Sequence, residues 1–221
     1  MNNLLNIKTP AEHEAGELAS DLGVKIHGLM NLRKVYWNLP AESLYEEIVF
    51  RGEGRLTHGG ALVVETGGHT SRAANDKFIV REPDSEGHVW WGEYNRPYPP
   101  ELFDELHRRL NGYLQGRDLF VQDVYAGADP RYRVAVRIIT ELAWQSLFAR
   151  NMLIPPASAD EYKQFVPEFT LITAPDFKGI RQIDGTHSNT FIVLNFAERL
   201  GLIGVSRYAG EIKKSIFTLM N

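Results

Sequence analysis

The chain has 221 residues, with 24 lysines and arginines against 28 aspartates and glutamates, for a formal net charge of −4. This near balance argues against broad electrostatic attraction to nucleic acid or to an anionic membrane. The absence of cysteine excludes disulfides, thiolate metal sites and a cysteine nucleophile, and it favours a reducing, cytoplasmic setting. Charged residues or glycine interrupt every apolar stretch, so we expect a soluble protein without a membrane span.

The first third of the chain alternates helix and strand patterns. We expect residues 1–10 to be exposed and disordered. The elements expected next are an amphipathic helix over 11–22, a strand over 35–37, a helix from 40 to about 51, and strands over 61–64 and 77–80. Leu44, Ile48 and Val49 are expected on one face of the second helix. A polar, glycine-containing loop separates the last two runs, which we expect to be neighbouring strands.

The rest of the chain continues this mixed rhythm. Residues 84–100 predict an ordered loop that carries Trp90 and Trp91. The further expected elements are helices over 100–115, 144–152 and 210–220, and strands over 118–125, 134–139, 169–173, 190–196 and 200–205. The apolar stripes of the first and last of these helices comprise Leu102, Leu106, Leu110 and Leu114, and Ile212, Ile216, Phe217 and Met220. The last two strands predict a hairpin. With no linker or repeat, the sequence predicts one α/β domain over residues 1–221, a mixed β-sheet with flanking helices.

Common catalytic patterns are missing from the sequence. The seven histidines include no pair at the i, i+4 spacing that lets two imidazoles share a metal, so we expect no self-contained zinc site. The G-x-S-x-G elbow of serine hydrolases is also absent. We interpret the four tryptophans as core or loop anchors and Asp129 with Arg131 as a solvated turn.

The segment from Gly204 to Ser215 leads from a strand into a helix that carries Lys213 and Lys214. It does not match the Walker phosphate-binding pattern, which places glycine directly before lysine. Adjacent lysines one turn into a helix point about 100° apart and oppose the positive end of the helix dipole. Such a pair is tolerated where an anion lies between the two lysines. The alternative, which spacing alone favours, is two solvated surface lysines beside Glu211.

A second candidate is the loop over residues 67–72, which is rich in glycine and hydroxyl side chains and carries Arg72. A loop at the end of a strand can direct the two-pronged guanidinium of an arginine at a carboxylate. The alternative is an ordinary hairpin loop in which Arg72 pairs with Asp76.

Motifs along nearly the whole chain from about Val35 resemble phosphoenolpyruvate carboxykinase of the ATP-using type. The motifs that carry the resemblance are RGEG at 51–54, DKF at 76–78, VRE at 80–82, WWGE at 90–93, VQD at 121–123, GA at 127–128, TE at 140–141, FARNM at 148–152 and YAGEIKK at 208–214. The resemblance implies the fold of the N-terminal domain of that family. It also implies a gluconeogenic lyase that converts oxaloacetate and ATP into phosphoenolpyruvate, ADP and CO2 with Mn²⁺ and Mg²⁺, without nucleic acid or membrane partners.

The resemblance also implies roles for single residues. Arg72 would grip a carboxylate of oxaloacetate or phosphoenolpyruvate, and Tyr208 would lie beside the substrate and CO2. Lys214 would contact the substrate and coordinate Mn²⁺ as a neutral amine, a form favoured when a second cation lies nearby. Lys213 would stabilise the phosphoryl group transferred from ATP, so both lysines would lie near the ATP phosphates.

Two departures from the family pattern shape the functional expectation. The family loop Thr-Gly-Arg-Ser-Pro-Lys-Asp-Lys is replaced by TSRAANDK at 70–77, which changes the loop geometry and removes one positive charge. The other metal ligands, the ATP-binding loop and the adenine site of the family follow the helix at which this sequence ends. We therefore expect a substrate-side domain that needs a C-terminal ATP-binding domain and is inactive alone. The alternative is a free-standing module that binds a dicarboxylate or phosphate.

Overall fold

The computed structural model describes residues 24–25, 27–68, 71 and 73–220, and it leaves the side chain of Asp84 undescribed. Its strands are β1 (Lys34–Trp37), β2 (Gly54–Leu56), β3 (Leu62–Val64), β4 (Lys77–Val80), β5 (Arg96–Tyr98), β6 (Asp118–Ala126), β7 (Val134–Thr140), β8 (Phe169–Ala174), β9 (Phe191–Asn195) and β10 (Leu200–Gly204). Its α-helices are α2 (Ala41–Phe50), α3 (Pro83–Glu86), α4 (Pro100–Leu114), α5 (Ala143–Met152), α6 (Ala159–Lys163), α7 (Arg181–Asp184) and α8 (Gly210–Leu219).

Eight strands form one mixed sheet in the order β1-β6-β7-β8-β10-β9-β4-β5, while β2 and β3 form a separate antiparallel pair. Strands β7, β8 and β10 run in one direction and the other five run in the opposite direction. The carboxyl ends of β7, β8 and β10 therefore meet at one edge of the sheet. This confirms the predicted α/β class with a mixed sheet and flanking helices.

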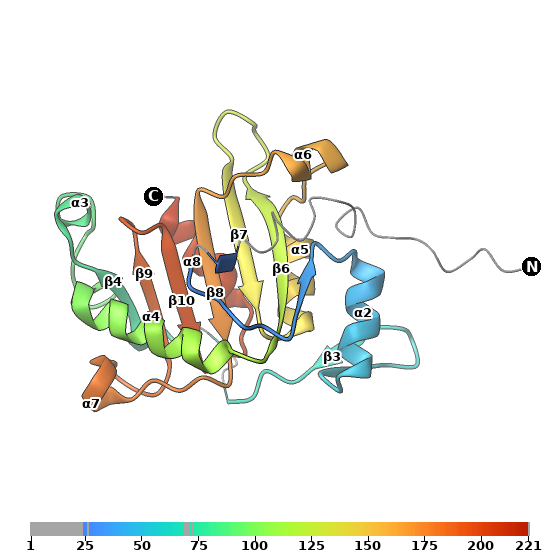
Figure 1. Ribbon diagram of the computed structural model, residues 1–221, viewed down its shortest axis with the longest axis horizontal. Coiled ribbons are helices and arrows are strands. Elements are labelled where there is room, and N and C mark those ends of the chain that lie inside the picture. The colour runs from blue at the N-terminus through green and yellow to red at the C-terminus, as the bar shows by residue number, and fades with distance from the viewer. Residues whose placement is uncertain (1–23, 26, 69–70, 72, 221) are drawn as a thin grey trace, which may run out of the picture.

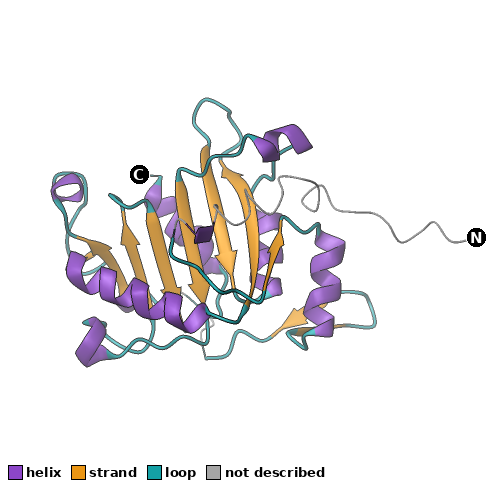
Figure 2. Cartoon of the chain, in the orientation of Figure 1, coloured by secondary structure: helices purple, strands orange, loops and turns teal. Residues whose placement is uncertain are grey.

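Helices cover both faces of the sheet. Helix α4 crosses one face and α5 and α8 lie against the other, as Figures 1 and 2 show, while α2 stands beside β1 and joins the core under α5 and α8. Each face of the sheet has its own hydrophobic core. Neighbouring residues of a strand contribute to different cores because successive side chains alternate between the two faces. Ile172 lies in the core under α4, for example, whereas Leu171 lies in the core under α2, α5 and α8. Strands buried on both faces explain why the central runs are almost continuously apolar.

The prediction that residues 61–64 and 77–80 form neighbouring strands is wrong. β3 pairs with β2, through Leu62 opposite Leu56, and β4 lies between β9 and β5 in the large sheet. The glycines around residues 52–60 suggested only turns, but Gly54 begins β2 at a point where a built Cβ would lie 2.9 Å from the Val63 carbonyl oxygen. Glycine is required at this position because β2 and β3 approach so closely that a side chain would not fit.

Regular structure also occurs where loops were expected. Within the predicted loop over 84–100, the structure has the end of α3 and the strand β5, and the short helices α6 and α7 were not predicted. The remaining expected helices and strands from residue 35 onward are present, and no end is shifted by more than about one residue. The predicted hairpin is confirmed, with Leu200 opposite Asn195. The expectations for residues 1–10 and 11–22 lie outside the described residues.

Several side chains differ from their predicted environment. In α4 the buried stripe uses Phe103 rather than Leu102, which is only partly buried. Val49, Phe217 and Met220 are 48%, 48% and 38% exposed, so none of the three is buried in the core as predicted. Trp90 is 91% exposed and anchors no core. No helix in the described part of the chain is long and apolar enough to cross a membrane.

Candidate functional site

The candidate site begins at the corner between β10 and α8. β10 ends at Gly204, and the next residue, Val205, has a φ of 65°. This left-handed conformation is strained for a β-branched residue. Strain of this kind costs about 1–3 kcal/mol and clusters at functional sites. The corner lies at the edge where the carboxyl ends of β7, β8 and β10 meet, and it leads through buried Ser206 to the helix.

The segment that precedes Arg72 in the sequence reaches the same edge. A Cβ built on Gly67 would lie 3.9 Å from Cδ of Arg207, which follows β10. Arg207 in turn forms an ion pair of 2.7 Å with Asp176, which follows β8. The fold therefore brings Gly67 to the β10–α8 corner, although about 140 residues of sequence separate the two.

Tyr208 lies against the first residue of α8. A Cβ built on Gly210 would lie 2.4 Å from two carbon atoms of the Tyr208 ring. Only a residue without a side chain leaves room for the ring in this position. The half-buried tyrosine is thus held over the start of the helix by a close contact with its backbone.

The two lysines of α8 have different surroundings. Lys213 is half-buried, and its Nζ lies 6.0 Å from the ring centroid of Phe217, one turn further along the helix. Lys214 is exposed and lines a cavity of about 420 Å³. The helical rotation of about 100° between neighbours accounts for this divergence. Of the two, the structure places Lys214 at the cavity.

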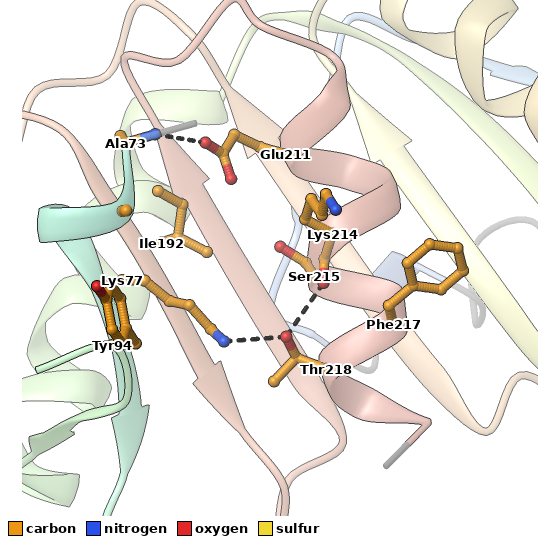
Figure 3. A pocket seen from close by; sticks show the side chains of 10 residues that line it. Ala73, Lys77, Tyr94, Ile192, Glu211, Lys214, Ser215, Phe217 and Thr218 are labelled. Atoms are coloured by element: carbon orange, nitrogen blue, oxygen red, sulfur yellow. Dashed lines mark hydrogen bonds between the residues drawn. The ribbon is translucent and has the colours of Figure 1, made fainter. Parts of the chain in front are cut away.

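This cavity, which we call the α8 cavity, lies between helix α8 and the start of β4. The charged and hydroxyl side chains that line it are Lys77 from β4 and Glu211, Lys214, Ser215 and Thr218 from α8. Figure 3 shows Lys77 reaching across from β4 to Thr218, with Nζ 3.0 Å from Oγ1. Lys77 Nζ also donates to Asn95 Oδ1 at 3.0 Å. Two hydrogen bonds therefore fix one cation at the cavity wall.

The residues predicted to carry the chemistry are only partly gathered here. Arg72, and with it the proposed Arg72–Asp76 pair, lies outside the described residues, but Ala73, the residue after Arg72, lines the α8 cavity. Tyr208 and Lys213 are not among the lining residues, and Lys214 is. Asp76 lies 3.5 Å from Nδ1 of His187.

The Asp129–Arg131 turn and the tryptophans were also interpreted from the sequence. The turn formed by Asp129 and Arg131 is solvated as predicted, with a 2.7 Å ion pair whose arginine is 75% exposed. Trp144 is buried as a core anchor, in contrast to exposed Trp90.

A divalent metal ion needs several oxygen or nitrogen ligands held close together. Over the described ranges, no group of three or more His, Asp or Glu side chains is placed to hold one. Lys214 is a single candidate nitrogen donor, and one donor does not make a metal site. The described residues therefore do not by themselves fit Mn²⁺ or Mg²⁺.

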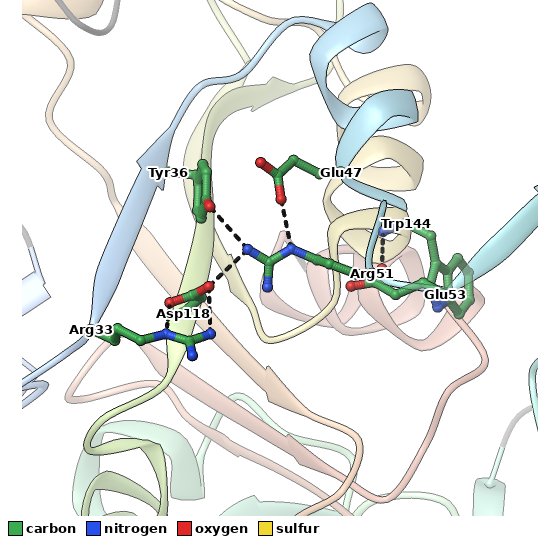
Figure 4. A network of polar contacts seen from close by, with 7 residues as sticks. All are labelled: Arg33, Tyr36, Glu47, Arg51, Glu53, Asp118 and Trp144. Atoms are coloured by element: carbon green, nitrogen blue, oxygen red, sulfur yellow. Dashed lines mark hydrogen bonds and ion pairs between the residues drawn. The ribbon is translucent and has the colours of Figure 1, made fainter. Parts of the chain in front are cut away.

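The motif at residues 51–54 has a structural role that the sequence did not reveal. Arg51 ends α2 and donates to Glu47 at 2.7 Å, to Asp118 at 2.8 Å and to the Tyr36 hydroxyl at 3.0 Å, as Figure 4 shows. Arg33 donates to the same aspartate at 2.6 Å and, with Arg51, holds the pKa of Asp118 below its usual value. These contacts join α2 to β1 and β6.

Glu53 supplies a helix cap from the same motif. Helix α5 has no side-chain cap of its own, and Glu53 Oε2 accepts a hydrogen bond of 3.0 Å from the backbone N–H of Trp144. Burial raises the pKa of Glu53, and the backbone contacts oppose that rise. A carboxylate at a helix N-terminus satisfies N–H groups that lack partners within the helix.

A second cavity, of about 530 Å³, lies beside this network and is lined by three arginines. Each guanidinium is paired with a carboxylate: Arg33 with Asp118, Arg51 with Asp118 and Glu47, and Arg117 with Glu141 at 2.7 Å. Because the charges are balanced internally, we interpret this region as structural rather than as an anion site.

Comparison with known proteins gave a consistent result. Residues 33–221 match the family model described as phosphoenolpyruvate carboxykinase. The chain is 54% identical over 199 residues to the phosphoenolpyruvate carboxykinase (ATP) of Geotalea uraniireducens, covering 90% of this chain and 37% of the relative. It is 52% identical over 197 residues to that of Thermus thermophilus, covering 88% and 37%. It is 47% identical over 208 residues to that of Methylobacterium nodulans, covering 94% and 38%. The chain thus spans less than two fifths of the length of these relatives.

Proposed function

Because the chain belongs to the phosphoenolpyruvate carboxykinase family, we propose that it is the substrate-side domain of an ATP-dependent member. The reaction proposed for the complete protein has two steps. Oxaloacetate loses CO2, and the electron pair of the broken C–C bond forms the enolate of pyruvate. The enolate oxygen then attacks the γ-phosphorus of ATP, which yields phosphoenolpyruvate and ADP.

Both steps concentrate negative charge, which fixed cations stabilise. In the proposal Arg72 and Tyr208 hold the carboxylate end of oxaloacetate, and Lys213 assists transfer of the phosphoryl group. Lys214 contacts the substrate. The observation that carries the proposal is that Lys214 and Ala73, the neighbour of Arg72, line the same cavity. A carboxylate held by the loop of Arg72 would lie within reach of the lysine helix.

ATP, Mn²⁺ and Mg²⁺ belong to the proposal only for the complete protein. Lewis-acid and charge-neutralising chemistry would come from the metal ions, for which this chain offers Lys214 as one donor. The described residues do not complete a metal site, so the roles proposed for this chain are those of its own side chains. The remaining ligands and the nucleotide site are proposed to lie in a further C-terminal domain, and the setting is proposed to be cytoplasmic gluconeogenesis.

The decisive variant is Lys214→Ala in a form of the protein that covers the full length of its relatives. Loss of one preorganised charge at the reacting group lowers turnover by about 100-fold or more. We expect that loss in Mn²⁺-dependent formation of phosphoenolpyruvate. The matched control is Lys163→Ala, which removes an exposed lysine from α6 and should leave turnover unchanged. Equal turnover in Lys214→Ala and the control would contradict the role of Lys214.

The 221-residue chain gives a second, simpler test. Alone it should form no phosphoenolpyruvate from oxaloacetate and ATP. Measurable formation would refute the proposal that a further domain must supply the nucleotide site and the remaining metal ligands. Added phosphoenolpyruvate should nevertheless shift the amide resonances of Ala73 and Lys214 in nuclear magnetic resonance spectra. A shift caused equally by inorganic phosphate would favour the alternative, a phosphate-binding module. A shift with a dicarboxylate but no turnover in the longer protein would favour a dicarboxylate-binding module.

A further inference from the structure

A buried carboxylate links the loop after Arg72 to the lysine helix. The backbone N–H of Ala73 donates to Oε1 of Glu211 at 2.6 Å. Glu211 lies in the first turn of α8 and is only 5% exposed. The two residues are 138 positions apart in sequence, so this contact is a tertiary link between the candidate substrate loop and the helix.

A second link joins the same two elements at the other end of the helix. Lys77 follows a 3-10 turn over Ala74–Asp76 and donates to Thr218. The Thr218 hydroxyl donates to the backbone carbonyl of Lys214 at 3.1 Å. The segment from Ala73 to Lys77 is therefore attached to α8 at both of its ends.

Both links lie on one face of α8. Glu211 and Thr218 are seven residues apart, which in an α-helix is nearly two full turns and a rise of about 10 Å. Lys214 lies between them in sequence and lines the cavity that the two links enclose, as Figure 3 shows. The distance between the loop and Lys214 is thus fixed by contacts on both sides of that lysine.

We propose that Glu211 is a positioning residue of the substrate site: by holding Ala73 it fixes the backbone directly beside Arg72 relative to Lys214. This inference rests on the proposed function, because it concerns the carboxylate that Arg72 and Lys214 are proposed to share. A charged acceptor makes a short, strong hydrogen bond to a backbone N–H. The positive end of the α8 dipole stabilises a carboxylate in the first turn.

Burial of the carboxylate argues for a role beyond stability. Removing a carboxylate from water is costly unless hydrogen bonds to the charged group replace the lost hydration. Glu211 is buried at the point where the loop meets the helix. Its hydrogen bond to Ala73 therefore fixes the position of the loop relative to α8. Lys77 and Thr218 support the same geometry from the far end of the loop.

The test compares three variants in the 221-residue chain. Glu211→Ala removes the acceptor, Glu211→Asp retracts it by one methylene while keeping the charge, and Glu211→Gln keeps an oxygen at the same reach. The matched control is Glu161→Ala on α6, which removes a carboxylate that accepts from the backbone N–H of Ala157 at 2.7 Å. Two quantities are measured: hydrogen exchange of the Ala73 amide and affinity for phosphoenolpyruvate.

For Glu211→Ala and Glu211→Asp we expect exchange at Ala73 to be faster by at least about tenfold and affinity to be weaker by about tenfold, the equivalent of about 1.4 kcal/mol. Glu211→Gln should restore both quantities to within about threefold of wild type because it keeps the hydrogen bond. Glu161→Ala should change neither.

Wild-type exchange at Ala73 in Glu211→Asp would overturn the proposal, even if Glu211→Ala fails to fold. Faster exchange with unchanged affinity would also overturn it, since the link would then hold the loop without positioning the site. A wild-type chain that does not bind phosphoenolpyruvate would contradict the proposed function alone. The exchange rate at Ala73 would still decide whether Glu211 holds the loop.

Discussion

The close contact between Gly210 and the Tyr208 ring means that one substitution can weaken ligand binding without lowering stability. Alanine at position 210 places its Cβ 2.4 Å from the present position of the ring, so the ring must move. The helix gains at most about 1 kcal/mol from the change, because alanine is favoured over glycine by that amount inside a helix and Gly210 is the first residue of α8. We therefore predict that Gly210→Ala leaves the free energy of unfolding unchanged or higher, but weakens phosphoenolpyruvate binding by about tenfold, or 1.4 kcal/mol. Denaturant unfolding and ligand titration measure the two effects.

Gly112→Ala is the matched control for this prediction. Gly112 lies exposed in α4, and a Cβ built there meets nothing within 4 Å. This variant should be more stable by up to about 1 kcal/mol and should bind phosphoenolpyruvate as the wild type does. If Gly210→Ala also bound like the wild type, the position of the Tyr208 ring would be irrelevant to the site.

At the scale of elements, the segment that leads into β1 is fastened to the sheet and to α4 by His27. Its Nε2 lies 2.8 Å from Oγ1 of Thr170 on β8, and its backbone carbonyl accepts from Asn111 of α4 at 2.8 Å. Burial lowers the pKa of His27 to about 4, and the nearby His107 and Arg137 add to this effect. The folded protein therefore holds His27 neutral well below the pH at which an unfolded chain protonates it.

This lowered pKa predicts the sign of a pH effect on stability. Above the unfolded value of 6.5 neither state is protonated, and between 6.5 and about 4 only the unfolded state gains the proton. Stability is therefore lost as the pH falls through that window. Between pH 7 and pH 5 we predict a loss from this group of about 1 kcal/mol, allowing for its partial exposure. Urea unfolding at both pH values should show a smaller loss in His27→Gln.

The comparison of wild type with His27→Gln isolates the histidine from other titrations. Burial raises the pKa of Glu53 and Glu141, so these carboxyl groups favour the folded state as the pH falls, the opposite sign. Burial lowers the pKa of His107, whose effect has the same sign as that of His27. These groups are present in both proteins and their contributions cancel in the comparison. The same loss of stability in both proteins would show that His27 is not the responsible group.

The strands also show which parts of the fold a sequence can predict. The β9–β10 hairpin was predictable because its partners are separated by a short turn and are both strongly apolar. The pairing of β4 with β9 was not, because β9 is more than a hundred residues away and no local signal encodes that pairing. The same holds for the site. The sequence marked Lys214 as unusual, but the Glu211–Ala73 link depends on the finished fold.

At the scale of the whole molecule, one sheet separates two cores that share every central strand. Adjacent residues such as Leu171 and Ile172 contribute to different cores while sharing one backbone. Loss of packing on one face therefore disturbs the strand that supports the other face. This mutual dependence is the physical reason to expect residues 1–221 to behave as a single domain, although helices α4 and α8 lie on opposite faces.

We accordingly predict one cooperative unfolding transition for the chain, with calorimetric and van't Hoff enthalpies that agree. Leu110 of α4 and Ile216 of α8 are each 0% exposed, and their replacement by alanine should each cost about 2–5 kcal/mol. Both variants should lower the midpoint of the same single transition, because either core supports the shared strands. Val166→Ala, at a position that is 77% exposed, should barely move it. A separate low-temperature transition in Leu110→Ala alone would show instead that the α4 face unfolds independently of the face that carries the lysine helix.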